Sequence, residues 1–299
     1  MLWLKKLRNI KKNLSLRKNQ DFKKWPEAKY KLVYFIAAYK NAEQLINLIK
    51  TIYRPNNLYY LNIDKKSPIV FYKKIKATFK NYPNIFISRS FVTWGKWDQV
   101  GTALSAIQKA LATDYGWTHF INLSGQDFPL KSQEEIQAEL AKQPQISFLE
   151  GEYFPKDHNY AGHLFISFLN NHFTKTLVRV DKVFHELKFY KGSQWMILSR
   201  DFCEHIINGE LPNKLKPLFK KIYIPDESYF VTLAANFPKK ENIIWENKRF
   251  IRWTQGWAHP HILTKKDLPE ILASQAYFAR KFDEKKDKEV LDYLRLRIL

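Results

Sequence analysis

Short apolar runs alternate with amphipathic helical segments along the first third of the chain. Residues 31–39 (KLVYFIAAY) and 58–64 (LYYLNID) have the apolar character of buried strands, and residues 42–53 between them repeat apolar side chains at helical spacing. A strand–helix–strand order favours parallel strands joined by helical crossovers. The alternation therefore predicts an α/β fold with a Rossmann-like, mostly parallel central sheet and helices on both faces.

The same alternation continues toward the C-terminus. Further strands are expected over 84–88, 118–130, 192–199 and 243–255, and further helices over 70–79, 98–112, 132–143, 200–208, 227–237, 267–274 and 288–298. The helix at 132–143 opens with a capping box, because Ser132 stands three residues before Glu135. Residues 144–190 show no clear period, which predicts an irregular excursion that faces a substrate.

The chain divides into a basic N-terminal arm, residues 1–24, and a single domain, residues 25–299. No repeat or change of composition splits the larger part, and no stretch reaches the ~20 apolar residues that span a bilayer. The arm intersperses apolar residues with Lys and Arg, which suits an anionic membrane surface. A solvated helix or a disordered tail is the alternative.

Motif content excludes several classes of function. The chain has no His-Glu-x-x-His, no G-x-G-x-x-G, no P-loop and no Asp-x-Asp. Its one cysteine, Cys203, rules out an intramolecular disulfide and a cysteine-built metal site, and it suits a reducing compartment. The net charge of +21 indicates an anionic partner, such as nucleic acid, lipid head groups or a phosphorylated substrate.

Three motifs carry a resemblance to a known family. They are INLSGQDFPL (121–130), IPDESYF (224–230) and YFARKFD (277–283). With the segments around them, they resemble the core-2/I-branching enzymes, a glycosyltransferase family that includes peptide O-xylosyltransferases. The likeness extends over roughly residues 30 to 293.

The resemblance implies a GT-A-like glycosyltransferase fold and the inverting transfer of a sugar from a UDP-sugar to a hydroxyl. It implies no cofactor and no divalent metal, with GlcNAc or xylose as the usual donor sugars. The chain lacks the membrane anchor and the many cysteines of animal members, so it resembles a bacterial cytoplasmic member. The expected acceptor is a glycan or lipid-linked saccharide of a surface polysaccharide or lipopolysaccharide, met at the inner face of the plasma membrane.

Donor binding is expected to rest on three cations. The resemblance maps basic residues of the family onto Arg249 and Lys281, and some relatives also use the position of Arg280. Fixed positive charge suits this role, because negative charge develops on the departing diphosphate. The alternative for the segment around 280 is a solvated charged stretch.

The general base of the family maps to Glu227. Inversion is a single displacement and needs one base beside the acceptor hydroxyl. If residues 227–237 are helical, Glu227 shares a stripe with the apolar Phe230 and Val231 and points toward packed structure, while Asp226 opens the helix. The alternative is that both acids only offset the dipole at the helix N-terminus.

Four further residues are expected to line the donor pocket, which in open α/β sheets lies beyond the carboxyl ends of the strands. By resemblance, Tyr39, Asp64 and Trp94 lie near the uridine and ribose, and Asp127 touches the sugar or braces its own loop. Their alternatives are aromatic packing for Tyr39 and Trp94 and a strand-end turn for Asp64.

Acceptor binding is assigned to Glu150, Glu152 and Trp195. Trp195 suits stacking on a sugar, although a core tryptophan on a strand is an equal interpretation.

Two other functions remain open. One is a basic nucleic-acid-binding protein, although the sequence contains no nucleic-acid-binding motif. The other is a relative that binds UDP or glycans without catalysis.

Overall fold

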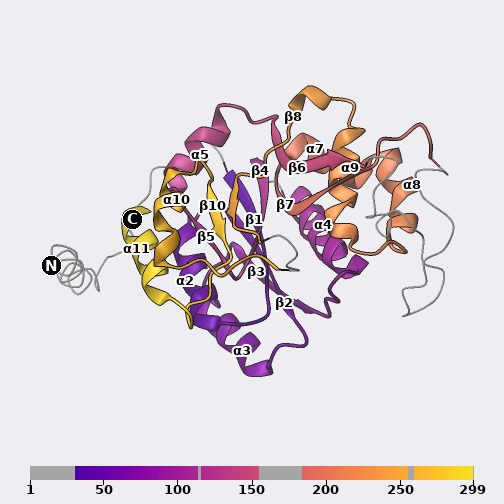
Figure 1. Ribbon diagram of the computed structural model, residues 1–299. Coiled ribbons are helices and arrows are strands. Elements are labelled where there is room, and N and C mark those ends of the chain that lie inside the picture. Colours follow the sequence, from indigo (N-terminus) through magenta and orange to yellow (C-terminus); the bar gives the residue numbers. More distant parts are fainter. Residues whose placement is uncertain (1–30, 114–115, 155–183, 255–258, 299) are drawn as a thin grey trace.

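The computed structural model describes residues 31–113, 116–154, 184–254 and 259–298. A seven-stranded sheet runs through the centre in the order β3-β2-β1-β4-β7-β6-β8 (Figure 1). Its strands are β1 (Lys31–Ala38), β2 (Leu58–Asp64), β3 (Ile85–Ser90), β4 (Trp117–Ser124), β6 (Ser147–Tyr153), β7 (Tyr190–Ser199) and β8 (Ile243–Ile244). The pairs among β1 to β4 are parallel, and β7 runs antiparallel to both β4 and β6.

Helices cover both faces of this sheet, as Figure 1 shows. One face packs against α2 (Ala42–Ile52), α3 (Ile69–Thr78), α5 (Gln133–Ala141), α10 (Leu268–Ala273) and α11 (Lys288–Ile298). The other packs against α4 (Trp97–Leu111), α7 (Arg200–Asn208), α8 (Glu210–Phe219) and α9 (Tyr229–Ala235). The predicted architecture, a mostly parallel sheet between two helical layers, is confirmed.

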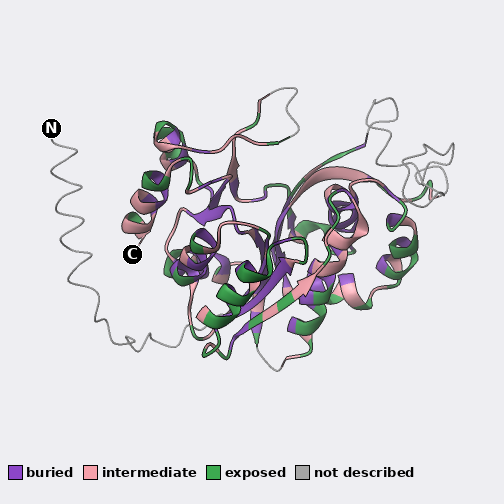
Figure 2. Ribbon diagram, turned by 90° about the horizontal axis from the view of Figure 1, so that it is seen from below, coloured by how far each residue is buried: buried purple, intermediate pink, exposed green. Residues whose placement is uncertain are grey.

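Strand β1 shows why the chain needs an unbroken apolar run. Leu32, Tyr34 and Ile36 belong to the hydrophobic cluster on one face of the sheet, while Val33 and Phe35 belong to the cluster on the other. Successive side chains of a strand point to opposite faces, so a strand covered on both sides needs apolar residues at every position. Figure 2 shows the same pattern, with buried residues along the central strands and exposed ones on the outer helices.

A second, three-stranded sheet joins the end of the chain to the loop after β4. Its strands are β5 (Asp127–Pro129), β10 (Phe278–Arg280) and β9 (Arg249–Ile251), with β10 in the middle. In the antiparallel β5–β10 pair, Asp127 lies opposite Arg280. Residues separated by about half the chain thus meet in this sheet.

Most predicted elements between 31 and 142 are found within one or two residues of their expected bounds, including the capping box of Ser132 and Glu135. Helix α8 and strand β10 were not expected. Strand β6 lies at the start of residues 144–190, which were expected to be irregular, and residues 155–183 of that segment lie outside the described ranges. The expected strand over 243–255 is two short strands, β8 and β9, because Lys248 between them adopts a left-handed conformation (φ 55°).

Two expectations concern residues outside the described ranges. The basic arm, residues 1–24, and the start of the domain up to residue 30 are among them, so the predicted boundary stays a prediction. Across the described ranges, no helix combines the length and the apolar character that crossing a bilayer requires.

Gly192 allows the close approach of β6 and β7. A Cβ atom at this position would lie 1.9 Å from the carbonyl oxygen of Glu150, and Gly192 faces Gly151 across the pair. We expect Gly192→Ala to force the strands apart and to destabilise the fold by about 1–3 kcal/mol, the usual cost of overpacking.

The measurement is the midpoint of thermal or denaturant unfolding. Gly116→Ala is the matched control, because a Cβ at Gly116 would meet no atom within 4 Å. Equal midpoints for the two variants would show that the β6–β7 pair tolerates the methyl group.

Candidate functional site

Three of the predicted donor-site residues meet at one edge of the central sheet. Tyr39 follows β1, Asp64 ends β2 and Trp94 follows β3, and these strands are parallel. Tyr39 and Trp94 are more than half exposed, at 53% and 58%. Large rings that stay this exposed at the carboxyl edge of a parallel sheet are suited to stacking on a ligand.

Hydrogen bonds tie the loops at this edge together. The Ser67 hydroxyl donates to the carbonyl oxygen of Tyr39 (2.8 Å), and the Lys66 amine donates to the carbonyl oxygen of Val92 (2.7 Å). Asp64 accepts from the backbone N–H of Lys66 (2.9 Å) and lies 3.4 Å from its amine. The edge is therefore connected from the first loop to the third, and Asp64 also serves in its own turn.

Asp127 and Arg280 form a buried ion pair beside Trp195. The Arg280 Nε atom lies 3.4 Å from Asp127 Oδ1, and its guanidinium lies 3.7 Å from the centroid of the Trp195 ring. Asp127 has no exposed surface and also accepts from the backbone N–H and the hydroxyl of Ser124, both at 2.9 Å. Burial lowers the pKa of Arg280, and the charge of Asp127 opposes this shift.

The surroundings of Trp195 change its predicted role. Trp195 is buried, and one ring face is covered by the guanidinium of Arg280. A stacking platform for an acceptor sugar needs a free ring face, so the structure favours the core interpretation for Trp195. In the structure its ring makes a cation–π contact with Arg280.

Lys281 extends the positive charge toward Lys40. Burial lowers the pKa of the Lys281 amine, and the neighbouring charges of Arg280 and Lys40 lower it further. Lys40 itself pairs with Asp283 at 3.0 Å. Among the described residues, the Lys281 amine makes no hydrogen bond, so its charge is available to a ligand.

Arg249 is held inside the protein. Its Nη2 atom donates to the carbonyl oxygen of Asn122 (2.9 Å), its Nη1 atom donates to that of Asn247 (3.1 Å), and its guanidinium lies over the ring of Phe278. Burial lowers its pKa to about 10, which leaves it charged at neutral pH. Its charge lies near Asp127 and Arg280, but most of its donors are engaged within the protein.

The two acids of IPDESYF lie in a single turn before α9. Residues Pro225–Glu227 form a 3₁₀ turn, and α9 begins only at Tyr229. Ile224 adopts a left-handed conformation (φ 51°), which costs a β-branched residue on the order of 1–3 kcal/mol. The expected helix from residue 227 is wrong at its start, because this turn and the extended φ of Ser228 (−133°) interrupt it.

The two acids differ in burial, and Asp226 is the more buried of the two. Asp226 is only 6% exposed, and its burial and the charge of Glu227 raise its pKa to about 7. Glu227 is half-buried. Burial raises its pKa, and the charge of Lys191 opposes the rise. The prediction that Asp226 opens the helix is wrong, because α9 begins only at Tyr229. Glu227 faces a partly open environment with the charge of Lys191 nearby.

The predicted acceptor residues lie on β6 and β7, and β7 contacts this turn. Glu152 faces Lys191 across the β6–β7 pair, and Asn247 donates a short hydrogen bond to Glu150. Between the paired positions around them, β7 has three residues where β6 has one, so β7 bulges at residues 193–195. Bulges of this kind redirect side chains next to functional sites, and this one carries Trp195 to Arg280.

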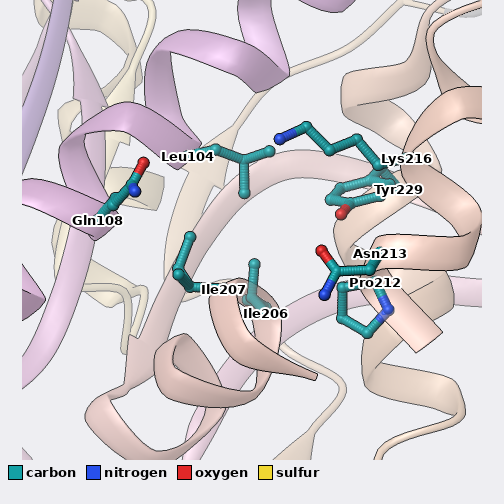
Figure 3. A pocket seen from close by; sticks show the side chains of 8 residues that line it. All are labelled: Leu104, Gln108, Ile206, Ile207, Pro212, Asn213, Lys216 and Tyr229. Atoms are coloured by element: carbon teal, nitrogen blue, oxygen red, sulfur yellow. The ribbon is translucent and has the colours of Figure 1, made fainter. Parts of the chain in front are cut away.

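The structure also contains a pocket of about 110 Å³ away from these residues. It lies between α4, α7 and α8, and Figure 3 shows Tyr229 beside Asn213 and Lys216 at its wall. None of the predicted site residues lines it. The carboxyl edge, and not this pocket, thus brings the candidate residues together.

Two contributors to the site were missed by the sequence analysis. Lys40 adds a cation beside Lys281, and the Gln126 side chain accepts from the Tyr39 hydroxyl (3.2 Å) and donates to the carbonyl oxygen of Phe282 (3.0 Å). Both could have been identified from their positions in the sequence. Lys40 follows the first strand, and Gln126 stands beside Asp127 in the INLSGQDFPL motif. Within the described ranges, no group of three His, Cys, Asp or Glu residues is placed to hold a metal ion.

Comparison with solved structures gives only a low similarity. The structure of S. aureus TarS 1–349 in complex with UDP matches with a TM-score of 0.36 and 14% identity, over 69% of this chain and 54% of that one. The mannosyltransferase Ktr4p from S. cerevisiae matches with a TM-score of 0.35 and 13% identity, over 76% and 72%.

Comparison with curated proteins gives longer sequence matches. A human beta-1,3-galactosyl-O-glycosyl-glycoprotein beta-1,6-N-acetylglucosaminyltransferase 3 is 25% identical, over 91% of this chain and 70% of the relative. A human N-acetyllactosaminide beta-1,6-N-acetylglucosaminyl-transferase is 28% identical, over 86% and 69%. A xylosyltransferase of Ciona intestinalis is 28% identical over 90% of this chain, which spans only 34% of that protein.

A family model described as "Branch: Core-2/I-Branching enzyme" matches residues 32–274. The match takes in the whole central sheet, the loop that carries Asp127 and the turn that carries Glu227. The resemblance seen in the sequence motifs is confirmed: the chain belongs to the core-2/I-branching enzyme family of glycosyltransferases.

Proposed function

We propose that this chain is an inverting, metal-independent glycosyltransferase that moves GlcNAc or xylose from a UDP-sugar to a hydroxyl of a glycan acceptor. One observation carries the proposal. Among the described residues, four cationic side chains, Lys40, Arg249, Arg280 and Lys281, interact electrostatically with two carboxylates, Asp127 and Asp283. This excess of two positive charges beside exposed Tyr39 matches the two negative charges of the diphosphate in a UDP-sugar.

The excess charge suits the chemistry of the leaving group. When the bond from the anomeric carbon to the diphosphate oxygen breaks, negative charge develops on UDP, and fixed cations stabilise it without reorganising. Lys281 has a free amine among the described residues, while Arg280 is oriented by Asp127 and Trp195. These side chains perform the role that an Asp-x-Asp-bound metal has in other transferases, and the sequence has no such motif.

Glu227 is the proposed base. It takes the proton of the acceptor hydroxyl as that oxygen attacks the anomeric carbon from the side opposite UDP, which inverts the configuration. The turn that holds Glu227 contacts β7, and β7 carries Trp195 under Arg280. The turn of Glu227 and the guanidinium of Arg280 thus both contact β7.

The acceptor and the cellular role rest on fewer observations. Glu150 and Glu152 provide hydrogen-bond acceptors for sugar hydroxyls on β6, which pairs with the strand that the turn of Glu227 contacts. A lipid-linked saccharide at the inner face of a bacterial membrane, in surface polysaccharide or lipopolysaccharide synthesis, suits the basic arm of residues 1–24. A cytoplasmic location belongs to the same proposal.

UDP is expected to raise the melting temperature of the chain by the same amount with and without EDTA. Binding to the folded state stabilises it by mass action, and protein cations need no metal to hold the diphosphate. Thermal-shift measurements in both conditions test this. Stabilisation that appears only when Mn²⁺ is added would contradict metal-independent binding.

Glu227→Gln is expected to lower kcat by about 10²-fold or more, because the amide takes no proton. UDP binding is expected to stay close to that of the unchanged chain. Glu241→Gln, at an exposed position outside the site, is the matched control. Full turnover by the Glu227 variant would remove this residue from the base role, and turnover by neither protein would favour a non-catalytic UDP-binding relative.

The activity is also expected to depend on pH through Glu227. The base works only when ionised, and burial raises its pKa, so kcat/KM should fall on the acid side at a higher pH than for an ordinary glutamate. Because Asp226 is adjacent and has a pKa of about 7, the two carboxyls titrate as a pair. A rate that stays constant down to the ordinary glutamate pKa of about 4.3 would contradict the assignment.

Lys281→Ala is expected to weaken UDP binding about tenfold or more, since it removes a partly buried charge from the diphosphate. Calorimetry or a thermal-shift titration measures the change. Lys285→Ala, an exposed cation four residues away, is the control and is expected to alter binding less than about twofold. Equal effects of the two substitutions would indicate a diffuse electrostatic attraction and not a site.

A further inference from the structure

Gln99 uses both ends of its side-chain amide to join two loops. It lies in the first turn of α4, where its Oε1 atom accepts from the backbone N–H of Gly95 (2.7 Å). Its Nε2 atom donates to Asp226 Oδ2 at 3.1 Å. We call these two hydrogen bonds the Gln99 bridge. It runs from the loop after β3 to the turn that carries Glu227.

The Gly95 end of the bridge is in close contact with the start of that turn. Gly95 has a φ of +71°, and a Cβ there would lie 2.9 Å from the Tyr223 ring. Its carbonyl oxygen accepts from the backbone N–H of Ile224 (2.9 Å), and the Trp94 ring meets the Tyr223 ring edge-on at 5.9 Å. The loop of Trp94 and the turn of Glu227 therefore share one packed contact.

At the other end of the bridge, the two carboxyl oxygens of Asp226 differ in their hydrogen bonding. Asp226 is buried, its Oδ2 atom accepts from Gln99, and its Oδ1 atom is buried without a hydrogen-bond partner. A buried carboxyl with few donors is costly, so the remaining hydrogen bond has a strong influence on its orientation. The left-handed Ile224 two residues earlier shows that the turn is not in its intrinsically preferred conformation.

We propose that Gln99 is a positioning residue that holds the turn of Glu227 against the loop of Trp94 through its bridge to Asp226. The inference rests on the proposed function, because it assigns Glu227 to the acceptor and Trp94 to the donor. The bridge fixes the distance between the base and the donor-side loop, and a displacement of about 1 Å in such a distance can cost 10²-fold in rate.

The test exchanges donor and acceptor across the bridge. Gln99→Glu keeps the acceptor for Gly95 but places a carboxylate against Asp226. Two carboxyls this close do not both ionise easily, so kcat is measured from about pH 7 to about pH 10. As the shared proton leaves toward the alkaline end, the two carboxylates repel each other and the contact opens. Gln99→Glu combined with Asp226→Asn restores the bond with its direction reversed, since the asparagine amide donates to the new carboxylate.

At the alkaline end of this range we expect Gln99→Glu to lower kcat at least tenfold, relative to the starting protein at the same pH, while the Kd for UDP changes less than about threefold. The double variant is expected to recover kcat to within about threefold of the starting protein. Gln108→Glu, which adds a carboxylate to the exposed side of the same helix, is the matched control. Melting temperatures of all four proteins are measured alongside.

Two results would overturn the proposal. One is a Gln99→Glu variant with full kcat, and the other is a double variant that regains its melting temperature but not kcat, which would make the bridge structural only. A starting protein that transfers no sugar at all would contradict the proposed function instead. In that case the recovery of the melting temperature in the double variant still reports the hydrogen bond, but no positioning role remains.

Discussion

Asp127 has no exposed surface, and its carboxylate meets the guanidinium of Arg280 where the two sheets join. A buried charge without a partner costs several kcal/mol, so each of these side chains requires the other. The pair fixes β5 against β10, and the hydrogen bonds of Asp127 to Ser124 fix this sheet to the end of β4. The C-terminal segment is thereby brought to the carboxyl edge of the central sheet, and Lys281 arrives with it.

The neighbouring acids at 226 and 227 illustrate how environment separates two identical groups. Asp226 is enclosed and its carboxyl tends to hold a proton near neutral pH, whereas Glu227 is more open and has the charge of Lys191 nearby. Two carboxyls this close do not both ionise easily. The proton that Asp226 retains reduces the negative charge beside Glu227, which is consistent with the proposal that Glu227 is the base.

The sequence predicted the first half of the fold well, because both faces of β1 and β2 are buried and their apolar runs are unmistakable. It predicted β10 and α8 poorly. β10 has three residues, too few to show the alternation of a strand. α8 contains Pro217, and a proline disfavours a helix when the local sequence alone is considered. For the site, motif matches gave the identities of the residues. The orientation of Trp195 depends on a bulge in β7 that its pairing with β6 reveals.

Local sequence patterns also fail to show that the helix starts at Tyr229 and not at residue 227. The helical stripe placed Glu227 inward only if residue 227 belongs to the helix, and the left-handed Ile224 delays the helix to Tyr229. A β-branched residue gives no local signal for such a conformation. It is held by tertiary contacts, chiefly the hydrogen bond from the Ile224 N–H to Gly95 in a loop more than a hundred residues earlier. The position of the proposed base is therefore a property of the assembled fold, set where the loop after β3 meets the turn before α9.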